Sequence, residues 1–584
     1  MDGQGRVSAA ADKSIGEGWL GLIAARRVSP VVVLLVAILA ALVVPPFYYL
    51  VKTSLYTTEA DGSFGTFTFE YYRELLQSRT LVADFLNSVR FALGSAFLAI
   101  TLGTVQAWIV ERTDTPLRQY VFMISIISLG LPHVLYTSAW ILVLGKGGPF
   151  NALLAALTGA LGPAFDVYTM SGMILIEGML WTPLAFLLLS PVFRTTDSTF
   201  EEAAMMCGAG IATTFRRVTL PLATPALLAL LLLIFIRAFE AFDIPALVGS
   251  AGDVSVLTTE VYNSIRKELP SNYGQAGAFS IILMVAVICL LSLQRRLLRD
   301  AERFQTITGK GYRPRVASLG RWRYVTAAIL VLSFLVLLVL PLGMVALTSL
   351  VPFYDGVSSD MFNRASLANY SLVFQSASFS GAIVNTLLLG AGTATVVCLL
   401  TAVAAWLSAR RYAGGWLLDQ IATAPLVFPA IVLSVAFLQY FLNAPFAIYG
   451  TVLSLIIAGS VQYLPYGMRF CFAGALQIHG ELEEAAASAG ADRFTTFIRV
   501  VAPLLLPTIL TSWLFVMLLS VRAVAMPILL SGPNSQVVAV ALFELWGNGQ
   551  VTELAAFGMI WSMFMMSIGA LFYLASRRNG VSVR

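Results

Sequence analysis

Long apolar runs alternate with short charged or turn-rich segments along the whole chain. The runs have about the length of roughly 20 residues that one helix needs to cross the hydrocarbon core of a bilayer. Strands of a membrane barrel would be about half as long and would alternate apolar with polar positions. We therefore predict an all-α membrane protein with about twelve transmembrane helices, near residues 31–51, 86–110, 120–145, 168–192, 222–248, 277–293, 325–350, 381–408, 418–442, 449–475, 504–530 and 555–576.

Composition supports a membrane location and argues against several other classes of protein. The 584 residues are 58% hydrophobic and 11% charged, which is too little polar surface for a water-soluble globule. Four cysteines and two histidines lie far apart, so we expect neither a disulfide framework nor a metal site. The net charge of +5 could suggest a nucleic-acid partner. In so apolar a chain, however, basic residues first set membrane orientation, and we expect no nucleic acid.

The distribution of lysine and arginine predicts the topology. If the N-terminus is cytoplasmic, the cytoplasmic side collects most of the 36 basic residues. Both termini are then cytoplasmic, and the first apolar run is read as a retained helix. The predicted division is a cytoplasmic segment 1–30, a first six-helix module 31–293, a basic cytoplasmic linker 294–324, a second six-helix module 325–576 and a cytoplasmic tail 577–584.

The two halves of the chain carry an internal repeat. An offset of 282 residues relates a set of matching residues after the fourth helix of each half, and an offset of 298 relates a second set around the second helix. Because each half has six helices, both halves would face the same way across the membrane, unlike an inverted repeat. The first set pairs Glu202, Ala203, Ala204, Gly208, Phe215 and Pro221 with Glu484, Ala485, Ala486, Gly490, Phe497 and Pro503; the second pairs Asn87, Trp108 and Arg112 with Asn385, Trp406 and Arg410.

The repeated loop has the features of a docking element. The acidic residues Glu201, Glu202, Glu483 and Glu484 suit the first turn of a short helix, where they oppose the positive end of its dipole. Gly208 and Gly490 permit a sharp turn, the phenylalanines supply apolar anchors, and the prolines are expected to break one helix and begin the next. A single copy could be an ordinary interfacial helix. Two copies in register favour a helix-turn-helix that docks a partner at the cytoplasmic face.

Charged residues within the predicted fifth and eleventh helices form a second candidate site. Arg237, Glu240 and Asp243 are spaced three apart, as if on one helical face. Position 240 plus the offset of 282 gives Arg522, so the repeat places Glu240 and an arginine at equivalent points. We predict that Glu240 and Arg522 form an ion pair between the halves, either as a structural brace or as part of a gate in the pathway, and that Asp243 belongs to the same site. His133 is expected to be a satisfied core histidine.

These loops resemble the cytoplasmic signature of permease subunits in type I binding-protein-dependent ABC importers. The span from about residue 86 to 576 is similar to two such permease modules fused in one chain, as in the ferric-iron and thiamine importer branch. The sequences Phe239 to Pro245 and Ala525 to Pro527 resemble ferric-iron permeases most. The second loop departs slightly from the family because Ala502 precedes Pro503 where a leucine is usual.

The resemblance implies a pore between two halves, in the inner membrane of a bacterium. Each loop would sit in a cleft of one of two cytoplasmic ATPase subunits, and a solute-binding protein would dock outside. No phosphate-binding Gly-x-x-x-x-Gly-Lys-Ser/Thr sequence occurs, so the chain is expected to be no enzyme and to hold no cofactor, with ATP bound by the partner subunits. Ferric iron ranks first as substrate, before thiamine, polyamines or phosphonates. An ion-gradient-driven secondary transporter, which would need neither loop nor ATPase, is the alternative class.

Overall fold

The computed structural model describes residues 29–59, 62–159, 162–195, 199–268, 270–299, 316–357 and 359–578. These residues are almost entirely helical, and the strands among them form one short antiparallel hairpin, β1 (Tyr56–Thr58) and β2 (Phe64–Phe67). The predicted N-terminal segment, the middle of the predicted linker and most of the predicted C-terminal tail lie outside the described residues.

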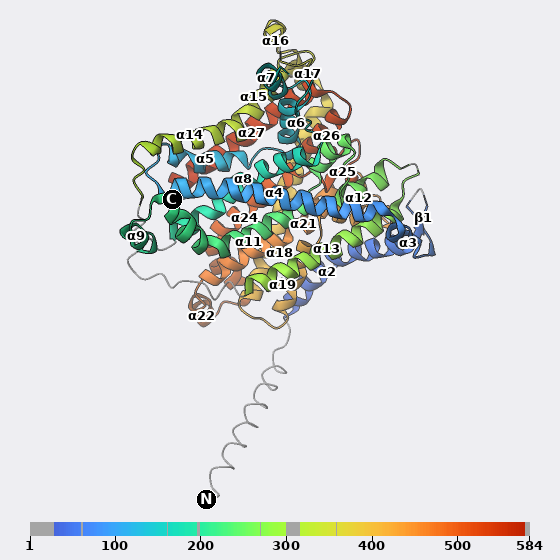
Figure 1. Ribbon diagram of the computed structural model, residues 1–584. Helices are drawn as coiled ribbons and strands as arrows, with labels where there is room; N and C mark the ends of the chain where they lie inside the picture. Colours follow the sequence, from blue (N-terminus) through green and yellow to red (C-terminus); the bar gives the residue numbers. More distant parts are fainter. Residues whose placement is uncertain are drawn as a thin grey trace, which may run out of the picture. The chain divides into compact units, whose positions relative to one another are not determined.

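The helices of the first half precede residue 300 and are shown in blue to green in Figure 1. They are α2 (Pro30–Leu55), α3 (Glu70–Gln77), α4 (Arg79–Arg112), α5 (Arg118–Ser128), α6 (His133–Leu144), α7 (Pro149–Thr158), α8 (Met170–Thr195), α9 (Thr199–Met206), α10 (Ile211–Thr214), α11 (Leu220–Phe239), α12 (Leu257–Arg266) and α13 (Tyr273–Arg299).

The helices of the second half follow the linker. They are α14 (Arg323–Phe334), α15 (Leu340–Ser349), α16 (Ser359–Asn363), α17 (Ala368–Gln375), α18 (Ala377–Ala409), α19 (Gly415–Thr423), α20 (Ala430–Asn443), α21 (Val452–Gln477), α22 (Glu481–Ser488), α23 (Arg493–Thr496), α24 (Ala502–Arg522), α25 (Pro527–Leu530), α26 (Val538–Gly547) and α27 (Val551–Arg578).

The described helices confirm an all-α membrane protein, with ten candidate membrane spans, or eleven if one broken pair counts as a single span. Twelve spans were predicted. The predicted helix 449–475 forms the unbroken helix α21 but is not among the candidate spans, and two other predicted helices are interrupted. The predicted helix 120–145 stops at Ser128 and restarts at His133, after Pro132. The predicted helix 418–442 is likewise interrupted at Pro429. A proline has no backbone N–H to donate, so it stands at the start of the second piece in both cases.

The predicted helices 222–248 and 504–530 also end early. Helix α11 ends at Phe239 and α24 ends at Arg522. In each half a short helical piece then begins at a proline, at Pro245 in the π-helix η2 (Pro245–Gly249) and at Pro527 in α25. Proline suits the first position of a helix because that N–H has no partner within the helix.

Contacts divide the chain into two compact units that do not follow the two sequence halves. Among the described residues, the smaller unit contains 29–48, 389–426 and 456–520, and its core includes Val397, Tyr463 and Val516. The larger unit contains residues 49–388, 427–455 and 521 onward, and one core cluster within it includes Phe186 and Phe193. The six-helix modules describe the sequence repeat, and their boundaries stay a prediction.

Hydrogen bonds within the larger unit repeat along with the sequence. The backbone N–H of Leu257 donates to Ser88 Oγ at 3.0 Å, and the N–H of Val538 donates to Thr386 Oγ1 at 2.8 Å. The hydroxyls lie 298 residues apart, the offset predicted for this part of the chain. In each half the hydroxyl therefore satisfies a donor at the start of a helix, α12 or α26, that has no partner of its own within that helix.

Small residues allow close packing of the two helices that precede each repeated loop. Helices α4 and α8 run side by side (Figure 1). A Cβ added to Gly103 of α4 would lie 2.6 Å from the Cβ of Ala185 in α8. In the smaller unit, a Cβ added to Gly467 would lie 2.8 Å from Thr401 Oγ1. Thr401 is the repeat counterpart of Gly103, and Gly467 is the counterpart of Ala185. The glycine therefore lies on the first helix of the pair in one half and on the second helix in the other, and the two helices approach closely in both halves.

This packing predicts that Gly103→Val destabilises the protein. The new side chain would collide with Ala185 and with the backbone N of Phe186 at 2.9 Å, and overpacking of this kind costs about 1–3 kcal/mol. Gly343→Val is the matched control, since Gly343 lies within helix α15 and has no atom within 4 Å of an added Cβ. Thermal unfolding in detergent should show a lower midpoint for Gly103→Val alone, and equal midpoints for both variants would contradict the packing account.

Candidate functional site

The first repeated loop is a short helix closed by a glycine turn. Gly208 follows α9 with a φ of +85°, a left-handed conformation that glycine adopts at little cost. Its N–H donates to the carbonyl O of Met205 at 2.9 Å, and the N–H of Ala209 donates to that of Ala204 at 3.0 Å. These two bonds form a Schellman motif, which satisfies the last carbonyls of the helix and turns the chain toward α10.

The second repeated loop has the same geometry. Gly490 follows α22 with a φ of +86°. Its N–H donates to the carbonyl O of Ala487 at 3.0 Å, and the N–H of Ala491 donates to that of Ala486 at 3.0 Å. Every donor and acceptor is displaced by 282 residues from its counterpart, so the predicted glycine turns are present in both copies. Glu202 and Glu484 lie in the first turns of α9 and α22, as the dipole argument predicted.

The prediction that Pro221 and Pro503 break the chain into separate helices is wrong. The backbone stays helical from α10 through the π-helix η1 (Phe215–Thr219) into α11, and from α23 through the π-helix η8 (Phe497–Val501) into α24. The N–H of Leu220 bonds to the carbonyl O of Phe215, five residues earlier. This wider turn shifts the hydrogen-bond register just before the proline, so the missing proline N–H interrupts one bond without ending the helix.

The predicted phenylalanine anchors pack on the tryptophans of the second repeat set. Phe215 contacts Trp108 near the end of α4, with ring centroids 4.9 Å apart. Phe497 contacts Trp406 near the end of α18, with centroids 5.1 Å apart. Each contact lies within one compact unit. The tryptophans are related by the offset of 298 and the phenylalanines by the offset of 282. Both copies therefore contain the same aromatic pair, with one residue from each repeat set.

An ion pair beside each aromatic contact ties the short helix, α9 or α22, to the end of a long helix, α4 or α18. Arg112 Nη1 lies 3.5 Å from Glu201 Oε2, and Arg410 Nε lies 2.8 Å from Glu483 Oε1. Arg410 also donates to the carbonyl O of Ile478 at 2.7 Å, and the indole N–H of Trp406 donates to Glu483 Oε2 at 3.2 Å. We call the Trp, Arg, Glu and Phe of each copy a clamp: Trp108, Arg112, Glu201 and Phe215; Trp406, Arg410, Glu483 and Phe497.

Sequence reasoning missed the pairing within the clamps. Glu201 and Glu483 were assigned only to the helix dipole, although Arg112 and Arg410 were already recognised as repeated positions. Opposite charges repeated in both halves were the available signal. Glu201 and Glu483 each occupy the first helical turn and are also held by an arginine. The other acidic residues of these turns are Glu202 in α9, and Glu481 and Glu484 in α22.

The second candidate site lies beyond the end of α11. Glu240 is the C-cap residue of that helix, and its Oε2 lies 3.4 Å from Arg237 Nη1. Arg522 ends α24 and donates to the carbonyl O of Leu129 at 2.6 Å. The pairing of Glu240 with Arg522 stays a prediction.

Asp243 does not share a helical face with Arg237 and Glu240, because α11 ends at Phe239. Its Oδ2 instead lies 3.0 Å from Nδ1 of His133, the first residue of α6. The expectation of a satisfied core histidine is met only in part, since His133 has this partner but its side chain is 24% exposed and lies outside the core. This contact joins the segment after α11 to the helix that begins after Pro132.

The described residues thus form a polytopic helical membrane chain with two copies of one loop. Residues 99–301 and 394–578 both match the family described as binding-protein-dependent transport system inner membrane component. The matched ranges cover well over half of the chain, and the chain belongs to this family. It is a fused two-module permease of an ABC importer.

Relatives with ferric transport names match across both modules. The ferric transport system permease protein FbpB of Actinobacillus pleuropneumoniae is 23% identical over 504 residues, 85% of this chain and 70% of that protein. The putative ferric transport system permease protein FbpB 1 of Haemophilus influenzae is 25% identical over 451 residues, 76% of this chain and 68% of that protein.

Two further similarities cover less of the chain. The putative 2-aminoethylphosphonate transport system permease protein PhnU of Salmonella typhi is 29% identical over 235 residues, 40% of this chain and 80% of that protein. The crystal structure of a bacterial ABC transporter that imports alginate includes a chain with 18% identity and a TM-score of 0.34, which covers 41% of this chain and 87% of its own.

The clamps predict that Arg410→Gln loosens helix α22. The substitution leaves the partly buried Glu483 carboxylate without its guanidinium, a loss of about 1–3 kcal/mol in local stability. Hydrogen exchange of the α22 backbone should then become faster, about tenfold for a loss of 1.4 kcal/mol. Arg499→Gln, at an exposed position of the π-helix η8, is the control. Unchanged exchange in Arg410→Gln would show that the clamp does not hold the loop.

Proposed function

We propose that the chain forms the solute pathway of a ferric-iron importer and couples it to two separate ATPase subunits. The observation that carries the choice of substrate is the extent of similarity. The relatives with ferric transport names align with 85% and 76% of this chain, across both repeats, whereas the 2-aminoethylphosphonate relative aligns with 40%, about one module. Both of these ferric-named relatives therefore match the fused, two-module arrangement of this chain.

Uptake measurements test the substrate. Deletion of the gene should abolish binding-protein-dependent uptake of radiolabelled ferric iron in iron-starved cells, and the wild-type chain should restore it. Uptake of thiamine, a polyamine and 2-aminoethylphosphonate should be unchanged by the deletion. Loss of 2-aminoethylphosphonate uptake with normal iron uptake would overturn the iron assignment and favour the phosphonate alternative.

The two repeated loops are proposed to seat one ATPase subunit each. Each loop presents apolar side chains to its surroundings, which is unusual next to so many charges. Phe200 is 53% exposed and Met206 is 89% exposed on α9, while Phe494 is 70% exposed and Ile498 is 49% exposed in the second loop. Such side chains fit apolar clefts of a partner, and the clamps would transmit force from α9 and α22 to α4 and α18.

The orientation and the outer partner belong to the same proposal. The bias of lysine and arginine puts both termini, the linker and both loops in the cytoplasm, where ATP is available. A solute-binding protein would then deliver the ion on the opposite face. A Glu240–Arg522 interaction is proposed to stabilise one state of the pathway between these two faces.

The coupling proposal predicts a phenotype for Gly208→Val combined with Gly490→Val. No atom lies within 4 Å of an added Cβ at either site, so the strain comes from the positive φ alone, about 1–2 kcal/mol per residue. The variant should insert normally but lose most binding-protein-stimulated ATP hydrolysis and uptake. Gly210→Val is the control, since Gly210 has a φ of −71° and equally open space. If the double variant showed normal ATP hydrolysis and uptake, the proposed docking role of the loops would be wrong.

A further inference from the structure

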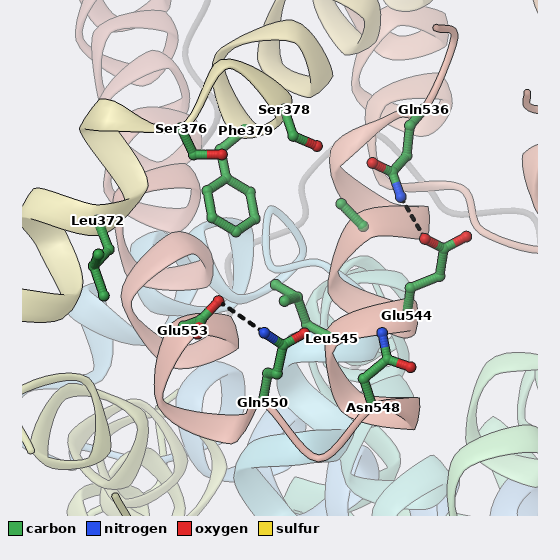
Figure 2. A pocket seen from close by; sticks show the side chains of 11 residues that line it. Leu372, Ser376, Ser378, Phe379, Gln536, Glu544, Leu545, Asn548, Gln550 and Glu553 are labelled. Carbon is green, nitrogen blue, oxygen red and sulfur yellow. Dashed lines mark hydrogen bonds between the residues drawn. The ribbon is translucent and has the colours of Figure 1, made fainter. Parts of the chain in front are cut away.

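A cavity lined by polar and apolar side chains lies between α17, the start of α18, α26 and the start of α27. Its volume is about 370 Å³, room for roughly a dozen water molecules at about 30 Å³ each. Figure 2 shows Leu372 of α17, Phe379 near the start of α18, and side chains of α26 and α27 around the same space. All of its lining residues belong to one compact unit: Leu372, Ser376, Ser378, Phe379, Gln536, Ala541, Glu544, Leu545, Asn548, Gln550 and Glu553.

The charge of the cavity has one sign. Glu544 and Glu553 are the charged residues of the lining, and no lysine, arginine or histidine accompanies them among the eleven residues. Gln536 Nε2 donates to Glu544 Oε2 at 2.5 Å, and Gln550 Nε2 donates to Glu553 Oε2 at 3.2 Å (Figure 2). A carboxylate offers about four acceptor sites, so one amide bond orients each group and leaves capacity for a cationic donor.

Three lining residues of the cavity have large apolar side chains, Leu372, Phe379 and Leu545, and we call these three its apolar wall. The ring of Phe379 packs on Phe557 of α27 with centroids 4.7 Å apart, and Leu545 is buried in α26. Leu372 completes this wall and is 53% exposed. A lining with two oriented carboxylates and an apolar wall matches a long cationic side chain, whose stem packs on apolar groups while its head binds carboxylates.

The cavity opens on the membrane face opposite to the first repeated loop. Three candidate spans separate α9 from α17 along the chain, namely Ile211–Phe239, Tyr273–Leu297 and Gly320–Ser349. An odd number of crossings puts the two elements on different sides of the bilayer. With the loops in the cytoplasm, as proposed above, the cavity faces the solute-binding protein.

We propose that this cavity is a docking pocket for an arginine or lysine side chain of the solute-binding protein. Its two carboxylates would pair with the basic group, and the apolar wall of Leu372, Phe379 and Leu545 would cover the stem. Arginine is enriched among the side chains that carry most of the binding energy at interfaces, and charge complementarity speeds association. This proposal rests on the proposed function, since it needs a binding protein as partner.

The test compares two double variants with equal loss of negative charge. Glu544→Gln with Glu553→Gln neutralises the pocket and keeps its shape. Glu59→Gln with Glu70→Gln is the control, because both residues are exposed between α2 and α4, on the same predicted face. Each full-length protein is assembled with its ATPase subunits in lipid nanodiscs. The probe is the purified binding protein that stimulates ATP hydrolysis by the wild-type complex, titrated at low and high salt.

At low salt, the concentration of binding protein at half-maximal stimulation should rise about tenfold in the pocket variant, the equivalent of 1.4 kcal/mol. It should change less than twofold in the control. The salt dependence of this concentration should also weaken in the pocket variant alone.

Equal half-saturation in the pocket variant and wild type would overturn the docking pocket and leave the proposed function intact. Slower uptake with unchanged half-saturation would also overturn it, and would favour a pocket for the transported cation. If no binding protein stimulates the wild-type complex, both proposals fail together.

Discussion

Every backbone amide inside a bilayer must find its partner within the protein, and this constraint explains most of the architecture. It makes the chain helical and restricts irregular backbone to places where other groups satisfy it. Prolines mark these places: Pro132 and Pro429 begin new helices, whereas Pro221 and Pro503 stay within continuous ones behind a π-helical turn. Side-chain hydroxyls satisfy free backbone donors at helix starts, since Ser88 and Thr386 each accept a hydrogen bond from the first N–H of a helix.

The clamps connect this interior to the surface loops. A short helix of eight residues has little stability of its own, so α9 and α22 depend on contacts with longer elements. An aromatic pair and an ion pair supply these contacts in both copies, at the ends of α4 and α18. The glycine turns then fix the direction in which each short helix points. Rigid attachment at one end and exposed apolar side chains at the other are what a force-transmitting loop requires.

Much of the fold and of the first site could be predicted from the sequence, because a duplicated pattern can be read without coordinates. The loops, the glycine turns and the phenylalanine anchors follow from residue type and from the two offsets. The number of uninterrupted spans could not be predicted, since hydropathy does not show where proline splits an apolar run. Asp243 was misplaced because nothing in the residue pattern ends α11 at Phe239. The clamp ion pairs depend on a contact between segments about 73 to 89 residues apart, which an offset alone does not show.

The central claim is that one chain presents two equivalent docking loops. Its most direct test is the composition of the assembled transporter, measured by native mass spectrometry after photocrosslinking groups are placed at Met206 and Ser488, the last residues of α9 and α22. The account predicts one permease chain with two ATPase chains, and each crosslinking position should capture one of them. A complex with a single ATPase chain, or capture from only one of the two positions, would contradict it.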